Sequence, residues 1–515
     1  MPRTPRPPMP KLAPFALMDE RPPRKARPQY LIVFLLFFAI PLFLIHLPLL
    51  SLPYFWDELG QFVPTALDLL RSGTPVAHST VPNVHPVGVE AYLALCYKLF
   101  GFSVEVTRVA MLAMGACGLL LTFLLAIELS RGTKGAPAFL PPILLLISPL
   151  FYTQSMLAQL DMPAMVFTLL ALLLFVRGQY VWAAVACVTL VLVKETGIVA
   201  PFVFCCALAL KKDWKRAGWF AISAVVLAGW LVLLHAKTGY WLGDAAFGRY
   251  NVSYALNPVR IAIAFPRRLF YLFCGEMRWI GTLVVILTAA KCKAFHTREW
   301  AVVGAVAGMT IILVSILGGA ELERYVLPVL PLFYIAASVG LTAVRKPWAI
   351  VATTAMIAGL VLCIRWNPPY PVPFENNYAM VDFVHLQQAA SAYAEHNLRD
   401  RKIATAWPYT AGLRNADLGY VEHGMKTVET GDLHFASVKR LPVEKFDTLI
   451  TYTREWVPGG VTENRLVQQF IRRFYQWAPD ITPEQCEELG LREKVSWSLG
   501  GQRSAVYIRK PAHEE

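Results

Sequence analysis

Long apolar runs recur along the chain from residue 30 to residue 365, separated by short polar segments. Such runs are typical of helices that cross a lipid bilayer, each of which needs about 20 apolar residues. The pattern predicts a polytopic α-helical membrane protein with about eleven transmembrane helices, some short enough to tilt or merge. The runs lie near residues 30–50, 105–128, 138–154, 160–177, 180–195, 196–210, 217–235, 270–291, 300–318, 326–344 and 347–365.

Two longer segments interrupt this pattern. The first, 51–104, has amphipathic stretches from Gln61 to Leu70 and from Val87 to Leu99, which predict helices lying in the membrane interface. The second, 236–269, is rich in aromatic and basic residues. These two segments are where polar chemistry can gather beside the membrane.

The composition changes at a Pro-rich linker, residues 367–374. Residues 375–515 are polar enough for a small soluble α/β domain. Its predicted helices are 382–397 and 463–477, its buried strands are 402–406 and 448–452, and its closing hairpin joins 494–499 to 504–509.

The charge pattern predicts the orientation. The chain is 56% hydrophobic with a net charge of +13. Its Lys and Arg lie in short segments between apolar runs, which favours membrane orientation over nucleic-acid binding. Residues 1–29 are then a cytosolic, basic, Pro-rich arm, and residues 375–515 lie outside a bacterial-type plasma membrane. The nine cysteines show neither zinc-site nor disulfide-framework spacing.

Under this topology several acids fall together on the outer face, where apolar surroundings make them costly unless they are used. Asp57 and Asp161 could equally cap helices that follow them. The acids are Asp57, Glu58, Glu90, Asp161, Glu195, Glu321 and Glu323.

Three bases on the same face also have two interpretations each. His85 precedes Pro86 and so lies on a turn, where it could contact a phosphate or a metal, or be solvated. Lys194 could pair with Glu195 or hold a phosphate. Arg324, at the head of an apolar helix, could extend along the interface or bind a phosphate.

Taken in order, these motifs form a recognisable set. They are Asp57-Glu58, His85-Pro86 followed by 91–101, Leu160-Asp161-Met162-Pro163, Val193-Lys194-Glu195-Thr196, and Glu323-Arg324-Tyr325 running on to Pro331. The set resembles the polyprenol-phosphate-dependent glycosyltransferases of the GT-C fold. The resemblance covers roughly residues 30–345. It is strongest with the branch that contains protein O-mannosyltransferases and the bacterial lipid A aminoarabinose transferase.

The match has departures. The aminoarabinose transferase pattern has Lys-Pro where this chain has His85-Pro86, and Lys-Gly-Pro where it has Lys194-Glu195-Thr196. The β-trefoil of the O-mannosyltransferases has no counterpart in the sequence. The resemblance therefore says more about the class of sugar donor than about the acceptor.

The resemblance implies transfer, with inversion, of a sugar from a polyprenyl phosphate to a lipid, glycan or protein acceptor by the domain 30–366. Asp57 would be the general base, with Glu58 beside it and Asp161 as the second acid. The anionic leaving group would be met by His85, Lys194 and Arg324, with Glu195, Glu323 and Tyr325 in support. Arg267 and Arg268 are assigned to the same role on charge and position alone.

Other interpretations remain open at this point. His85 with Glu90, Asp57 or Asp161 offers N and O ligands for a divalent metal, although the spacing does not establish one. A transporter or flippase of lipid-linked or amphiphilic substrates is the alternative function. It would place charges along a pathway in pseudo-symmetric halves, whereas these gather at one face. A sensor or scaffold would leave the acids unexplained.

Overall fold

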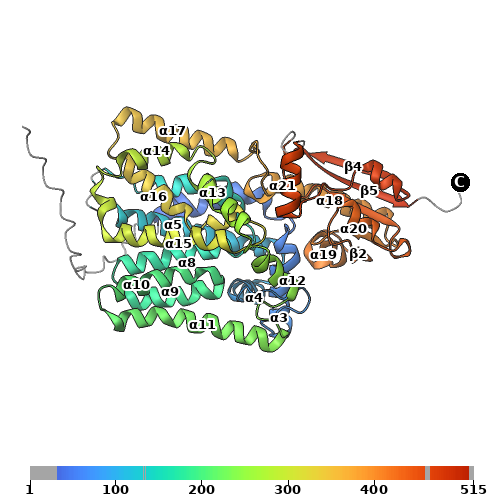
Figure 1. Cartoon of the computed structure of the whole chain (residues 1–515), viewed down its shortest axis with the longest axis horizontal. Coiled ribbons are helices and arrows are strands. Elements are labelled where there is room, and N and C mark those ends of the chain that lie inside the picture. The colour runs from blue at the N-terminus through green and yellow to red at the C-terminus, as the bar shows by residue number, and fades with distance from the viewer. Residues whose placement is uncertain (1–31, 132, 134, 459–463, 510–515) are drawn as a thin grey trace, which may run out of the picture.

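Apolar helices lie side by side and form a helical body, with a C-terminal domain packed against one end (Figure 1). The computed structural model describes residues 32–131, 133, 135–458 and 464–509. The predicted cytosolic arm, 1–29, lies outside the described residues. We call the end of the helical body that contacts the C-terminal domain the domain end.

Each of the eleven predicted runs coincides with helix, but the helices differ in length. Among the residues that the structure describes, five helices are long and apolar enough to cross a membrane: Ile32–Leu49, α5 (Val104–Leu129), α11 (Trp214–Thr238), α15 (Arg298–Ile316) and α17 (Lys346–Cys363). Five apolar helices are shorter: α8 (Asp161–Val176), α9 (Tyr180–Val193), η4 with α10 (Glu195–Ala209), α14 (Trp279–Thr288) and α16 (Leu330–Leu341).

Two predicted runs are not single helices. The run near 138–154 forms α6 (Leu140–Leu146) and α7 (Pro149–Gln154), because Ser148 is extended ahead of Pro149. The run near 270–291 begins inside α13 (Pro258–Phe273) and continues as α14. Between them Glu276 and Met277 have φ of 53° and 63°, which helical residues do not adopt.

The first long segment supplies a helical layer at the domain end. After the π-helical turn η3 (Glu58–Phe62) come α3 (Val63–Ser72) and α4 (Gly88–Phe100), close to the two amphipathic stretches predicted. They pack on each other and bury Leu67, Leu93 and Tyr97. The second segment forms α12 (Ala245–Gly248), the π-helix η5 (Arg249–Ser253) and the start of α13.

The C-terminal domain holds a five-stranded mixed sheet with strand order β2-β1-β3-β5-β4. The central β1 pairs in parallel with β2 and β3, and the hairpin β4–β5 adds to β3 in antiparallel fashion. The predicted helices and strands are all present: α18 (Ala379–Asn397), β1 (Ile403–Thr405), β3 (Thr448–Tyr452), α21 (Arg465–Tyr475), β4 (Leu491–Leu499) and β5 (Gln502–Arg509). Sequence reasoning missed four short elements: α19 (Tyr409–Arg414), β2 (Thr427–Glu429), α20 (Phe435–Lys439) and α22 (Pro483–Glu488).

The domain is joined to the helical body by more than its linker. The Tyr420 hydroxyl donates to the Tyr54 carbonyl at 2.8 Å. The Trp407 indole lies so close to Gly60 that a Cβ there would come within 2.3 Å of the ring. Side chains from both parts share one buried apolar cluster. The domain therefore has a fixed position over the loop that carries Asp57.

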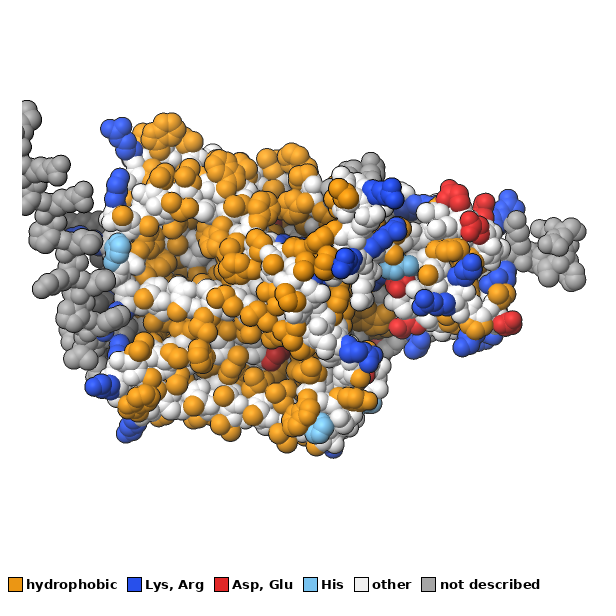
Figure 2. Space-filling model, in the orientation of Figure 1, with side chains coloured by type: hydrophobic (Ala, Val, Ile, Leu, Met, Phe, Trp, Pro, Cys, Tyr) orange, Lys and Arg blue, Asp and Glu red, His pale blue; other side chains and the backbone are white. Residues whose placement is uncertain are grey.

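Figure 2 shows how the surface divides. Hydrophobic side chains cover the flank of the helical body, as expected for a surface that faces lipid. Lys and Arg side chains gather at the end opposite the domain and again over the domain itself.

Candidate active site

Arg324 lies at the centre of a buried cluster of charges at the domain end. It belongs to the short helix η7 (Glu323–Val326) and is 4% exposed. Its guanidinium forms ion pairs with Asp57, with Asp161 at 3.2 Å and with Glu375 at 3.0 Å. These carboxylates come from three segments far apart in the sequence, so the tertiary fold assembles the site.

The loop before η3 directs Asp57 toward Arg324. Trp56 has φ of 42°, in the left-handed region, and reverses the chain direction beside the buried Tyr54 and Phe55. Asp57 directly precedes η3 but makes no capping hydrogen bond to it. The capping alternative is therefore not the one the structure shows, and the Asp57 side chain keeps 16% exposure beside Arg324.

Glu58 points away from this cluster. Its Oε1 accepts from Arg108 Nη1 at 2.5 Å and from the Ala158 N–H at 2.5 Å, and its Oε2 accepts from the Phe55 N–H at 2.9 Å. The side chains of Glu58 and Arg108 are both fully buried. Arg108 also donates to the carbonyls of Leu52, Pro53 and Met156. Glu58 thus links the Asp57 loop to α5 through its ion pair with Arg108.

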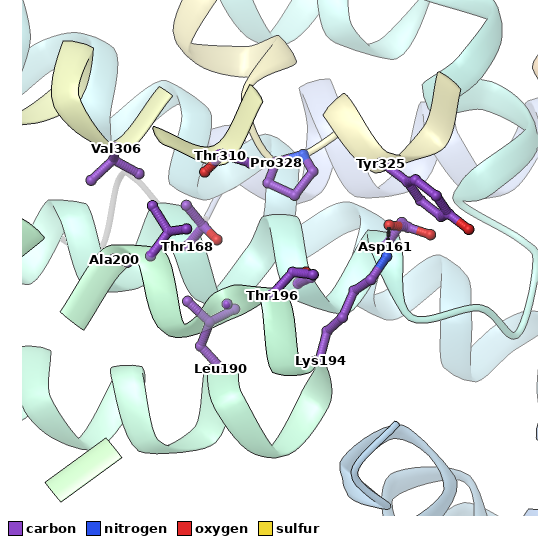
Figure 3. Close-up of a pocket in the computed structure, with 13 residues that line it drawn as sticks. Asp161, Thr168, Leu190, Lys194, Thr196, Ala200, Val306, Thr310, Tyr325 and Pro328 are labelled. Carbon is purple, nitrogen blue, oxygen red and sulfur yellow. Dashed lines mark hydrogen bonds and ion pairs between the residues drawn. The ribbon is translucent and has the colours of Figure 1, made fainter. Parts of the chain in front are cut away.

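Asp161 links Arg324 to Lys194. It begins α8, and its Oδ1 lies 2.5 Å from the Nζ of Lys194 while Oδ2 faces Arg324. Lys194 ends α9 in an extended conformation, which lets its side chain reach back toward α8. Figure 3 shows the Lys194 ammonium directed at Asp161, with Tyr325 on the far side of that carboxylate.

The ring of Tyr325 has three cations around it. Lys194 Nζ lies 4.4 Å from the ring centroid, and the guanidinium carbons of Arg268 and Arg324 lie at 5.2 and 5.8 Å. They come from α9, α13 and η7. An aromatic face stabilises nearby cations without neutralising them. Three cations thus gather next to Asp161, and two of them, Lys194 and Arg324, are ion-paired there.

The adjacent arginines Arg267 and Arg268 are used differently. Arg267 is committed to Glu323, with Nε and Nη2 at 3.0 and 2.6 Å from Oε1, and Asn376 donates to the other oxygen of Glu323 at 3.1 Å. Arg268 is 2% exposed and donates to the Leu322 carbonyl. Its Nε and Nη2 are buried without a hydrogen-bond partner among the residues described. Buried donors left unpaired are costly, so these two N–H groups are available to a bound water or ligand.

His85 forms a separate pair beside this cluster. Its Nδ1 lies 2.8 Å from Oε2 of Glu195, the residue after Lys194. Within the described part of the chain, no three His, Cys, Asp or Glu side chains gather as metal ligands. Asp57 and Asp161 both face Arg324, and Glu90 is buried with Oε2 unpaired. The proposed donor set for a metal is therefore not brought together.

Sequence reasoning missed Glu375. It directly follows the Pro-rich linker and enters the helical body, where Gln159 donates to its Oε2 at 3.2 Å. It is 3% exposed. Burial raises the pKa of Glu375 to about 7, against an opposing effect from Arg324. The only signal in the sequence was a run of polar residues, 375–377, directly after the prolines.

A pocket leads from the charged cluster into the helical body. It holds about 350 Å³ of empty space, including the part that opens to the outside. Asp161, Lys194 and Tyr325 line one end, whereas Ala200 and Val306 line the other (Figure 3). The pocket thus has a polar end and an apolar end, between α8, α10 and α15.

Comparisons with known proteins show which proteins this chain is similar to. The model of Glycosyltransferase family 87 matches residues 91–318, from α4 to just beyond α15. A search of curated proteins by sequence gives no significant match.

Two solved structures share the fold over nearly the whole chain. ArnT from Cupriavidus metallidurans, bound to undecaprenyl phosphate, has a TM-score of 0.52 and 14% identity, covering 93% of this chain and 98% of that one. The archaeal oligosaccharyltransferase AglB from Archaeoglobus fulgidus, in complex with an inhibitory peptide and a dolichol-phosphate, has a TM-score of 0.51 and 11% identity. It covers 94% of this chain and 75% of that one.

These matches confirm the GT-C resemblance predicted from the sequence. The class of protein is a multi-pass membrane glycosyltransferase. The family it resembles by sequence is Glycosyltransferase family 87.

Proposed function

We propose that this protein transfers a sugar, with inversion, from a polyprenyl phosphate to a lipid, glycan or protein acceptor, with Asp57 as the general base. One observation carries the proposal. Asp57, Asp161, Lys194 and Arg324, which lie in four separate motifs, meet in one cluster, and Asp161 and Lys194 also line a pocket.

The pocket fits a lipid phosphate in its chemistry. A phosphate needs positive charge and N–H donors, and Lys194, Arg268 and Arg324 supply both around Tyr325. A polyprenyl chain needs an apolar path, which Leu190, Val199 and Ala200 offer. The bound lipid phosphates of the two similar structures agree with this assignment.

In this proposal Asp57 removes a proton next to that phosphate. One of its oxygens faces Arg324, and the side chain is still partly exposed. In the proposed step Asp57 accepts the proton of an acceptor hydroxyl or amine, and that oxygen or nitrogen bonds to the anomeric carbon. The bond from the anomeric carbon to the phosphate oxygen breaks, and the phosphate leaves with the electron pair. The nearby cations stabilise its added negative charge.

The remaining predicted residues act on these groups. Glu58 positions the Asp57 loop through Arg108. Glu323 holds Arg267, and Glu195 holds His85 next to Lys194. Tyr325 places its ring among the three cations. We assign these residues positioning roles.

The proposed orientation puts the domain end outside the plasma membrane and the Lys- and Arg-rich end in the cytosol. A phosphatase reporter fused after residue 370 is then expected to be active outside. A cytosolic reporter active at the same position would reverse the orientation.

The donor assignment is tested with Arg268 and its neighbour. Purified full-length protein in detergent micelles is titrated with undecaprenyl phosphate, and bound lipid is counted by native mass spectrometry. We expect Arg268→Gln to weaken binding by about 10- to 100-fold, because two buried charged donors are lost. Arg267→Gln should weaken binding less than Arg268→Gln does, because the Arg267 guanidinium is already paired with Glu323. Equal binding by all three proteins would remove Arg268 from the donor site.

Transfer itself is measured with a radiolabelled polyprenyl-phosphate sugar in membranes that contain the protein. The expected result is release of free lipid phosphate together with a labelled product. Retention of all label on the lipid phosphate, with acceptor lipids and glycans present, would contradict the proposed reaction.

A further inference from the structure

Two tryptophans flank Asp57 where the C-terminal domain meets the helical body. Trp56 directly precedes Asp57, and Trp407 comes from the loop after β1. Their ring centroids lie 6.2 Å apart at an interplanar angle of 88°. Both side chains are half-buried, so each keeps part of its indole uncovered. Contact with Gly60 fixes Trp407 in this position.

Arg454 completes this group from the loop after β3. Its guanidinium carbon lies 5.8 Å from the centroid of the Trp56 ring. The side chain is half-buried, and its Nε is buried without a hydrogen-bond partner. Among the residues that the structure describes, Arg454 forms neither a hydrogen bond nor an ion pair. Asp480 lies within electrostatic reach but not at ion-pair distance.

Other arginines at the domain end are ion-paired. Arg324 pairs with three carboxylates, Arg267 pairs with Glu323, and Arg260 pairs with Glu321 at 3.3 Å. A partly desolvated guanidinium that lacks such a partner is unfavourable unless a ligand supplies one. Arg454 also lies close to Asp57, because the Trp56 ring that it faces belongs to the residue directly before Asp57.

The chemistry of the group selects its ligand. Indole faces give large, rigid contact area to the apolar face of a flat or ring-shaped ligand. A guanidinium fork fits a carboxylate or a phosphate with two hydrogen bonds. A ligand that satisfies all three side chains is a saccharide with an acidic group, and Asp57 would lie next to its hydroxyls.

We propose that Trp56, Trp407 and Arg454 form the acceptor subsite and that the acceptor is an acidic saccharide, free or carried on a lipid. This assignment rests on the proposed glycosyl transfer. The sugar ring packs against the indoles, and its carboxylate or phosphate pairs with Arg454. The C-terminal domain thereby selects the acceptor, while the helical body holds the donor.

The test uses full-length protein in detergent micelles saturated with undecaprenyl phosphate, so that the cations around Tyr325 are occupied. Binding is followed by saturation-transfer NMR with three probes. These are methyl glucuronide for a carboxylate, glucose 6-phosphate for a phosphate, and methyl glucoside as the neutral reference. We expect at least one acidic probe to bind about tenfold more tightly than the neutral one. The stronger of the two identifies the acidic group.

Variants separate the contributions. Arg454→Gln should reduce binding of the acidic probe to that of methyl glucoside, and Trp407→Leu should weaken all three probes. Arg503→Gln is the matched control, because Arg503 lies in the same domain and is paired with Glu493 at the surface. Thermal unfolding shows that each variant is folded. Equal binding of acidic and neutral probes, or unchanged binding by Arg454→Gln, would overturn the proposal.

The two proposals can fail separately. If undecaprenyl phosphate does not bind the unchanged protein, the proposed donor is wrong. Arg454-dependent binding of methyl glucuronide in the same sample would still support a site for acidic saccharides.

Discussion

Asp57 and Glu58 are neighbours in the sequence, yet their carboxylates lie in different environments. Glu58 pairs with Arg108 where neither side chain has any exposure, and two backbone N–H groups complete its hydrogen bonds. Asp57 pairs with Arg324 where the carboxylate keeps 16% exposure. One ion pair is fully buried, whereas the other keeps part of its carboxylate exposed. The difference distinguishes Glu58, which stabilises the loop, from Asp57, which we propose as the general base.

Replacing Asp57 gives the largest expected effect on activity. Asp57→Asn keeps the shape of the side chain but cannot accept the acceptor's proton, so transfer should fall about 10²- to 10⁴-fold. Thermal stability should change little, because the side chain is partly hydrated. Rates are measured with the radiolabelled donor. Asp417→Asn, an exposed acid of the C-terminal domain, is the control and should keep full activity. A rate for Asp57→Asn within tenfold of the unchanged protein would contradict the base assignment.

Replacing Glu58 should instead reduce stability. Glu58→Gln leaves Arg108 buried without its counter-charge, which costs about 3–5 kcal/mol. The measurement is thermal unfolding in detergent micelles. Glu58→Gln combined with Arg108→Met should recover much of the loss, because no unpaired charge remains buried. If Glu58→Gln and Asp57→Asn were both as stable as the unchanged protein, the two ion pairs would not differ in the way we infer.

The helices were predictable because each apolar run is long enough to form one. Lengths and breaks were less predictable. The interruption near 274–278 depends on two residues with positive φ and on Arg278, which donates to the carbonyls of Tyr271 and Leu272. Such a break satisfies tertiary contacts, and hydropathy alone does not encode it.

Only the site residues that belong to a recognised motif could be predicted. Asp161, Lys194 and Arg324 were expected on one face, and the structure brings them into contact. Glu375 and Arg454 were missed because both come from beyond the linker, and nothing in the sequence states that this part folds back over the Asp57 loop. Glu58 was placed with Asp57 because adjacency in the sequence does not show which way each side chain points.

Glu375 allows a further test, which uses the pH dependence of the protein's stability. Its pKa is raised from 4.5 to about 7, so the native state binds this proton more readily than the unfolded chain. Stability contributed by the protonated form is complete below about pH 4.5 and is lost as pH rises through about 7, by on the order of 3 kcal/mol. Glu375→Gln should remove this part of the pH dependence. It is measured as the difference between the thermal unfolding profiles of the two proteins from pH 4.5 to 8. Parallel profiles would show that Glu375 is ionised throughout.

The smallest effect is expected at the exposed contact between Arg71 and Asp417, which lie 2.7 Å apart with side chains 60% and 42% exposed. Water and salt screen such a pair, so Arg71→Gln should cost less than about 1 kcal/mol. The difference should vanish in 0.5 M NaCl, whereas the loss in Glu58→Gln should persist because buried charges are poorly screened. Both are read from thermal unfolding at low and high salt. A loss of more than about 2 kcal/mol for Arg71→Gln would mean that this surface pair, and not only the buried contacts of Trp407 and Tyr420, fixes the domain over the site.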